Sequence, residues 1–352
     1  MKFLHTAARL HIARLLIALS AGLFLSAPST AAESASNTPK PHREVATAIG
    51  KAMREHLYNP KLINTPAYAA IEAKVAALAA RPLARADFLR QFNEIWQSGP
   101  FSHVVLTESE GSPLEMAQHF DTLRIGGGGA KLSWQANTPV LTVTTMMGQD
   151  TIEEVHAAFA EMAKRAPKAL VLDLRENKGG AFVSRALISH LVSEPFDAGV
   201  FMSRGWYAQH DAAPALKDAL ALKPWDGWTV QSFWADVQAQ PLTRVQLQPI
   251  APVFKGPVFV LVSPTTASAA ELTAEALRSA RKATLIGERS SGKMLSQSPY
   301  ALPEGLQIFL PIADYHSHGS GRIEGVGLRP DIEVPADRAL ETALARIAAA
   351  AR

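Results

Sequence analysis

The sequence predicts an α/β fold, in which helices and strands form packed layers. Short apolar runs suited to buried strands recur at residues 139–145, 169–174, 257–263 and 283–287. Helical segments separate them, for example TIEEVHAAFAEMAKR at residues 151–165, which carries acidic residues in its first turn. Strands that alternate with helices in this way are typical of an α/β core. A chain of 352 residues, of which 47% are hydrophobic, can bury a core of this kind.

The chain begins with the features of a secretory signal peptide, expected at residues 1–31. Lys2, Arg9 and Arg14 precede an apolar run at residues 15–25, and small residues suited to cleavage follow. The alternative is an uncleaved anchor, although the run is short for a membrane span. Loss of these three basic residues would cancel the formal net charge of +3. We therefore expect an exported protein, periplasmic or secreted, without a stable membrane span and without a basic surface for nucleic acid.

A linker and a small helical region are expected next. Residues 32–42 are polar and contain proline, which is typical of a linker. Residues 43–98 carry apolar residues at spacings of three and four and predict a helical N-terminal region. Pro60, Pro66 and Pro82 should divide it into short helices.

Residues 99–138 are interpreted as a connecting hairpin segment. The glycine run at residues 126–129 is expected to be its flexible connection. A phosphate-binding loop is the alternative for these glycines. It is disfavoured because neither a strand-then-helix context nor a Walker-type lysine accompanies them.

The α/β core is expected at residues 139–336, followed by a C-terminal helix at residues 337–352. Within the core, residues 201–250 form an aromatic-rich insertion, interpreted either as a packed cap or as a substrate groove. The candidate substrate-binding residues of this insertion are Trp206, Tyr207, Trp228 and Trp234.

Ser268 is the candidate nucleophile. It lies five residues after a buried strand, where the chain enters a helix, among the small residues Ala267, Ala269 and Ala270. A helix N-terminus favours developing negative charge, and the N–H of Ala269 is free to donate to an oxyanion. An ordinary N-cap serine is the alternative, since serine is a favoured cap.

Lys293 is the candidate base, because no histidine lies in the segment between Ser263 and Gln297. A lysine in an apolar, desolvated place can lose its proton and accept one from a serine hydroxyl. Gln297, four residues on, can orient the amine without adding charge. A solvated loop lysine is the alternative.

A third feature is the glycine pair that ends LVLDLRENKGG, residues 170–180. Polar residues at the end of a buried strand, followed by Gly179 and Gly180, indicate a close backbone approach. The N–H of Gly180 is therefore a candidate second oxyanion donor. A plain strand-to-helix turn is the alternative.

Together these segments resemble the C-terminal processing (tail-specific) serine peptidases. The matching stretches are ALVLDLRENKGG (169–180), VFVLVSPTTASAAE (258–271), LIGERSSGKMLSQ (285–297) and GVGLRPDIEVP (325–335). The resemblance implies a crotonase-like (ββα spiral) α/β core and an exported serine endopeptidase that acts on protein or peptide substrates through an acyl-enzyme.

Residue by residue, the resemblance implies a role for each candidate. Ser268 is the nucleophile, Lys293 the general base and then acid, and Gln297 the residue that holds Lys293. The backbone N–H groups of Gly180 and Ala269 form the oxyanion hole. Glu271 also matches the family motif and is interpreted as structural. No metal and no cofactor are expected, and the chain contains no cysteine.

One departure from the family changes the expected substrate recognition. About 40 residues separate the helical region from the core, too few for the PDZ domain of the tail-specific members, so we expect a member without one. This layout and the FSHVVL stretch around His103 are closer to relatives of the interphotoreceptor retinoid-binding-protein type. A non-catalytic ligand-binding protein on the same fold, and a hydrolase of small esters or amides, are therefore the alternative functions.

Overall fold

The computed structural model describes residues 38–350, and the expected signal peptide lies outside them. The chain divides into two compact units. The first comprises residues up to 116 together with residues 297–312, and the second comprises residues 117–296 together with residues 313–352. Within the described part of the chain, none of the helices combines the length and the apolar character needed to cross a bilayer.

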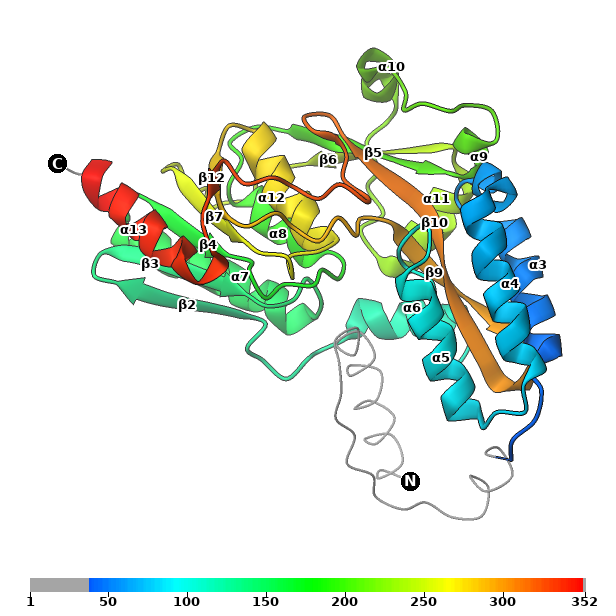
Figure 1. Ribbon diagram of the computed structural model, residues 1–352. Coiled ribbons are helices and arrows are strands. Elements are labelled where there is room, and N and C mark those ends of the chain that lie inside the picture. Colours follow the sequence, from blue (N-terminus) through cyan, green and yellow to red (C-terminus); the bar gives the residue numbers. More distant parts are fainter. Residues whose placement is uncertain (1–37, 351–352) are drawn as a thin grey trace, which may run out of the picture. The chain divides into compact units, whose positions relative to one another are not determined.

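The first unit is helical between residues 43 and 97. Its elements are α3 (Arg43–His56), the 3-10 helix η1 (Pro60–Asn64), α4 (Pro66–Ala80) and α5 (Arg85–Gln97). Figure 1 shows α3, α4 and α5 packed side by side. Pro66 occupies the first turn of α4, and the Thr65 hydroxyl accepts the N–H of Tyr68 at 3.3 Å. Buried rings such as Phe92 and Trp96, whose centroids lie 6.3 Å apart, fill the interior.

Strands complete the first unit. They are β1 (Val105–Glu108), β9 (Ser296–Leu302, all but its first residue) and the first part of β10 (Leu306–Ser317). β1 pairs antiparallel with β10. The Asn93 side chain binds both the N–H and the carbonyl of Leu106, at 2.9 Å each, and so ties α5 to β1.

The glycine run is not the turn of a hairpin, contrary to expectation. The hairpin joins β2 (Ala130–Gln135) to β3 (Thr138–Val143) across residues 136–137. The glycine loop instead binds two carboxylates of the helix α7 (Gln149–Arg165). Asp150 accepts the N–H groups of Gly126 at 2.8 Å and Gly127 at 2.9 Å, and Glu154 accepts that of Gly128 at 2.8 Å. The anion that these glycines bind therefore belongs to the chain itself. The helix α6 (Pro113–Thr122), which the hairpin interpretation did not include, precedes this loop.

The second unit is built on a largely parallel sheet, which confirms the α/β prediction. Its strands run in the order β12-β8-β7-β4-β3-β2, and only the β2–β3 pair is antiparallel. The strands not yet introduced are β4 (Leu170–Asp173), β7 (Val258–Val262), β8 (Ala283–Gly287) and β12 (Ile332–Glu333). The central strands are apolar on both faces, as a sheet covered by helices on each side requires.

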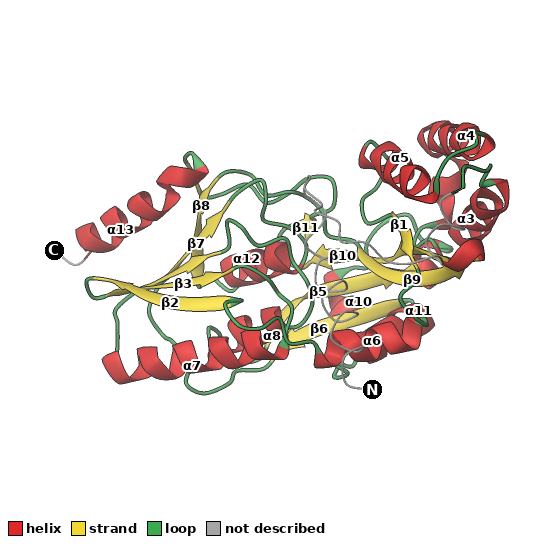
Figure 2. Cartoon of the chain, turned by 90° about the horizontal axis from the view of Figure 1, so that it is seen from below, coloured by secondary structure: helices red, strands yellow, loops and turns green. Residues whose placement is uncertain are grey.

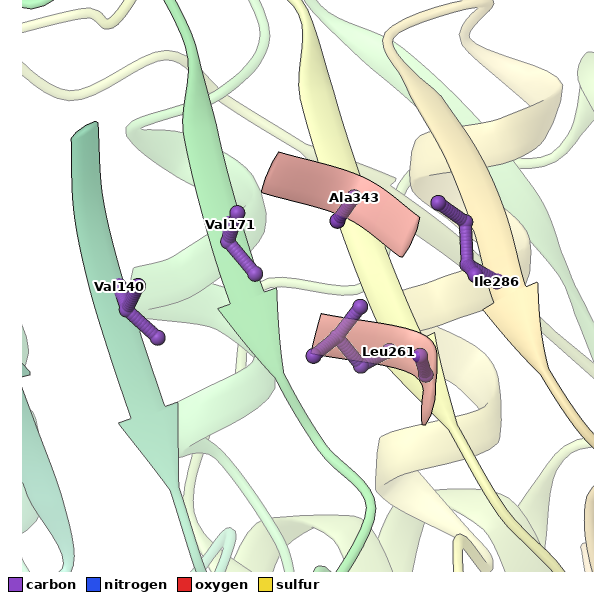
Figure 3. Packing of buried hydrophobic residues seen from close by; sticks show 6 residues of the cluster. Val140, Val171, Leu261, Ile286 and Ala343 are labelled. Atoms are coloured by element: carbon purple, nitrogen blue, oxygen red, sulfur yellow. The ribbon is translucent and has the colours of Figure 1, made fainter. Parts of the chain in front are cut away.

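Helices cover both faces of this sheet. Figure 2 shows α13 (Ala339–Ala350) on one face and α7, α8 (Val183–Ser189) and α12 (Ala269–Ser279) on the other. Under α13, the side chains of Val140, Val171, Leu261 and Ile286 project from adjacent strands toward Ala343, and all are nearly inaccessible (Figure 3). Small alanines on α13 allow this close approach of helix and sheet.

A second, antiparallel sheet in this unit carries the aromatic-rich insertion. β5 (Phe196–Ser203) pairs with residues 313–317 of β10 on one side and with β6 (Leu242–Leu247) on the other. The segments between β5 and β6 are α9 (Arg204–Tyr207), α10 (Leu216–Ala221) and α11 (Val230–Ala239). The insertion is therefore a set of short helices held between two paired strands.

Candidate active site

The candidate residues of the second unit follow neighbouring parallel strands. Gly180 comes after β4, Ser268 after β7 and Lys293 after β8. These strands are adjacent and parallel, so their carboxyl ends meet at one edge of the sheet. Ligand sites in open α/β sheets lie outside the carboxyl ends of the strands, and this edge is where the chemistry is expected.

Ser268 has a backbone conformation that is unusual for a residue with a side chain. Its φ is 56° and its ψ is −125°, directly before the first residue of α12. Such strain persists only where surrounding contacts impose it. Here the N–H of Ala267 donates to the carbonyl of Asn177 at 3.0 Å, and the N–H of Ser268 donates to the Glu271 carboxylate at 2.9 Å. The turn therefore presents a partly exposed serine at a helix N-terminus.

The glycine pair lies directly against this serine. A Cβ on Gly179 would come within 2.6 Å of the Ser268 Cβ and 2.8 Å of the Ala267 carbonyl oxygen, so only glycine fits. Both glycines also have positive φ, 94° and 142°. Among residues 38–350, the N–H groups of Gly180 and Ala269 have no hydrogen-bond partner. Both are therefore available to an oxyanion formed at Ser268.

Asn177 connects three segments of the site, a role that the sequence interpretation missed. It is fully buried. Its side chain accepts the N–H of Gly179 at 2.8 Å and donates to the carbonyl of Val143 at 3.0 Å. Its own carbonyl accepts the N–H of Ala267. The position of Asn177 two residues before a glycine pair was the available signal, because asparagine commonly bonds the backbone two residues on.

Glu271 connects the nucleophile turn to the lysine segment. This fully buried carboxylate accepts the N–H groups of Ser268 and Lys293 on one oxygen, at 2.9 Å and 3.0 Å. Its other oxygen accepts the N–H of Gly292 at 2.8 Å and the hydroxyl of Ser290. Since two of these bonds end on one oxygen, the backbone nitrogens of Ser268 and Lys293 lie within two hydrogen-bond lengths of each other.

The environment of Glu271 has opposing effects on its ionisation. Burial raises the pKa of this carboxyl, while the four donors favour the charged form and limit the rise. The Ser290 hydroxyl accepts the N–H of Leu328 at 2.6 Å, so its own proton is directed at Glu271. The GVGLRP segment that contains Leu328 thus supports the same carboxylate.

Lys293 is not in the desolvated place that a lysine base was expected to occupy. The residue is exposed, and within residues 38–350 its hydrogen bond is that of its backbone N–H to Glu271. The neighbouring Met294 is buried, and its N–H donates to Glu324 at 2.7 Å, so alternation along the segment turns Lys293 outward. Gln297 lies at the beginning of β9 and belongs to the first unit; its Oε1 is buried and has no hydrogen-bond partner among the described residues.

The four candidate aromatic residues differ in their surroundings. Trp206 stacks on His210 and donates to the carbonyl of Ala212, a local packing arrangement. Tyr207 is buried, with its hydroxyl 3.1 Å from Asp314. The rings of Trp234 and Phe120 meet edge-to-face, with their centroids 6.2 Å apart.

Trp228 differs from the other three in its partner. Its ring lies 5.9 Å from that of Phe182, which follows Gly180 by two residues. Of the four, Trp228 is therefore the one that packs against the segment following the glycine pair.

Comparison with known proteins identifies related sequences. The family model of peptidase family S41 matches residues 137–334. A carboxyl-terminal-processing protease of Picosynechococcus is 29% identical over 184 residues, which is 52% of this chain and 36% of that protein. A carboxy-terminal-processing protease of Bartonella bacilliformis is 40% identical over 191 residues, 53% of this chain and 36% of that protein. The match thus spans about a third of the length of these curated relatives, and it confirms the resemblance predicted from the motifs.

Solved structures share the fold. The photosystem II D1 C-terminal processing protease has a TM-score of 0.51 at 15% identity, covering 85% of this chain and 94% of that one. A lipoprotein from Streptococcus agalactiae has a TM-score of 0.55 at 13% identity, covering 94% and 99%. At these identities the likeness shows the fold alone, and it confirms an α/β core with a helical N-terminal region.

Proposed function

This chain belongs to peptidase family S41, and we propose that it is an exported serine endopeptidase that cleaves protein or peptide substrates. One observation carries the proposal. The free N–H groups of Gly180 and Ala269 lie beside the strained, partly exposed Ser268. An N-cap serine needs neither a strained φ nor a glycine pair packed against its Cβ, whereas a nucleophile with an oxyanion hole needs both a presented hydroxyl and free donors.

The reaction follows from these positions. The Ser268 oxygen attacks the substrate carbonyl carbon while its proton passes to the base, and the carbonyl oxygen becomes an oxyanion held by the two N–H groups. The carbon–nitrogen bond then breaks, the amine leaves with the proton from the base, and an acyl-enzyme remains. Water, deprotonated by the same base, attacks the ester and restores the serine.

The proposal assigns the base to Lys293. A lysine accepts a proton only as a neutral amine, which removal of water favours. Because Lys293 is exposed, we propose that the bound peptide excludes water from its amine. The backbone tie from Lys293 to Glu271 supports this assignment, since it holds the lysine segment beside the nucleophile turn.

Four proteins test the proposal: the chain without residues 1–31 and its variants Ser268→Ala, Lys293→Ala and His103→Ala. Hydrolysis of casein and of fluorogenic peptides should be lost by about 10³-fold or more in the first two variants and retained in the third. Activity that survives Ser268→Ala would refute the nucleophile. If His103→Ala lost peptide hydrolysis while Lys293→Ala kept full activity, the base would be a histidine and not Lys293. Binding of peptides without turnover in all four proteins would indicate a ligand-binding protein.

A further inference from the structure

We propose that an aromatic cluster beside Gly180 forms the subsite for the substrate side chain that precedes the scissile bond, and that it selects an apolar residue there. The aromatic cluster is defined by Phe182, Trp225, Trp228 and Phe233. The proposal rests on the proposed peptidase function and names the substrate class of the same site.

The cluster brings together two segments that are distant in sequence. Phe182 lies between the glycine pair and α8, whereas the other three residues belong to the insertion between β5 and β6. The centroid of the Phe182 ring is 5.8 Å from that of Trp225, 5.9 Å from Trp228 and 6.4 Å from Phe233. These are contact distances for aromatic pairs. The insertion thus packs its rings against the residue that follows the oxyanion turn.

The position of Phe182 determines which substrate side chain can reach the cluster. Phe182 lies two positions after Gly180, a chain length of at most about 7 Å. In the proposed mechanism the N–H of Gly180 binds the oxygen of the scissile carbonyl. The residue that contributes this carbonyl, the acyl residue, carries its side chain on the Cα attached to the carbonyl carbon. The proposal therefore assigns that side chain to the cluster.

The exposure of the cluster leaves room for a ligand. All four rings are partly exposed, although each packs against at least two of the others. An apolar side chain that covers such surface gains about 25 cal/mol for each Å² removed from water. The Arg185 guanidinium lies 4.9 Å from the centre of the Trp228 ring. Its permanent positive charge disfavours a lysine or arginine side chain at the same place.

The cluster is also held in place before any substrate binds. The Trp225 indole N–H donates to Asp236 at 2.9 Å, and the Trp225 backbone N–H donates to the carbonyl of Arg244 on β6 at 2.9 Å. The Asp121 carboxylate accepts the N–H groups of Val230 and Gln231 at the beginning of α11. A rigid subsite loses less side-chain entropy on binding, which favours selectivity.

The test compares peptides that differ only at the acyl residue, carrying leucine, alanine or lysine there. For the wild-type chain, kcat/KM should fall in that order, with leucine favoured over lysine by at least about tenfold. In Trp228→Ala the leucine preference should fall by about tenfold, and Trp228→Phe should retain most of it.

A matched control is available on the same unit. Trp134 on β2 also carries an arginine over its ring, Arg165 at 4.2 Å, but it lies opposite Pro139 at the first strand positions of β3, away from the carboxyl ends. Trp134→Ala should leave the ranking of the peptides unchanged. An unchanged ranking in Trp228→Ala would overturn the subsite while leaving the peptidase intact. A wild-type chain inactive on every peptide would overturn the peptidase function and the subsite with it.

Discussion

The substitution Glu271→Gln tests whether the buried carboxylate organises the active site. Glutamine has nearly the same shape but replaces one acceptor oxygen by an NH₂ group. Whichever position the NH₂ takes, two of the four donors around Glu271 then face another donor. Leaving a buried donor unpaired costs about 1–3 kcal/mol, so the free energy of unfolding should fall by about 2–6 kcal/mol.

The effect on catalysis should exceed the effect on folding. The same carboxylate fixes the backbones of Ser268 and Lys293, and a displacement of about 1 Å in a reacting group costs about 10²-fold in rate. Urea unfolding measures the stability loss, and peptide hydrolysis at a temperature where the variant is folded measures the rate. Normalising the rate to the fraction labelled by an active-site serine reagent separates misplacement from unfolding.

The control is the same substitution one turn later on the same helix. Glu275 is equally buried, but among the described residues its side chain accepts a hydrogen bond from Ser279 and none from the segments of Ser268 and Lys293. Glu275→Gln should leave the rate per labelled molecule close to that of the wild type. Equal stability and equal rates in the two glutamine variants would refute the argument that Glu271 organises the site.

Three further predictions concern other parts of the second unit. Gly179→Ala should abolish hydrolysis, because its Cβ would collide with Ser268; wild-type turnover in this variant would contradict the described contact. Burial alone would raise the pKa of Asp150, but the backbone N–H groups that it accepts lower this pKa below its usual value. The ionised carboxylate therefore stabilises the fold above about pH 4, and this stabilisation is lost as the pH falls through the lower pKa of the folded state. Asp150→Asn should therefore cost about 1–3 kcal/mol at pH 7 and progressively less below pH 4 in urea titrations. Leu261→Ala, at an inaccessible position under α13, should lower the free energy of unfolding by about 2–5 kcal/mol, and a smaller loss would indicate that α13 settles into the space.

Local patterns predicted the fold class and the candidate nucleophile turn. The central strands are apolar at nearly every position and alternate with helices, so their burial and their layers could be predicted without a structure. Ser268 and the glycine pair could be recognised for the same reason. A serine among small residues at a strand-to-helix turn, and a glycine pair where two backbones approach closely, are both visible as patterns within a few residues of sequence.

The tertiary structure decided which distant groups meet. Glu271 was interpreted as structural from its place in a motif, but three of its four hydrogen-bond donors lie 19 to 22 residues away and include the backbone of Lys293. The glycine run looked like a hairpin turn, yet its N–H groups bind Asp150, more than 20 residues on. The exposure of Lys293 likewise depends on what packs around it. Hydrogen-bond partners and burial are set by segments that folding brings together, and composition and spacing within one segment do not encode them.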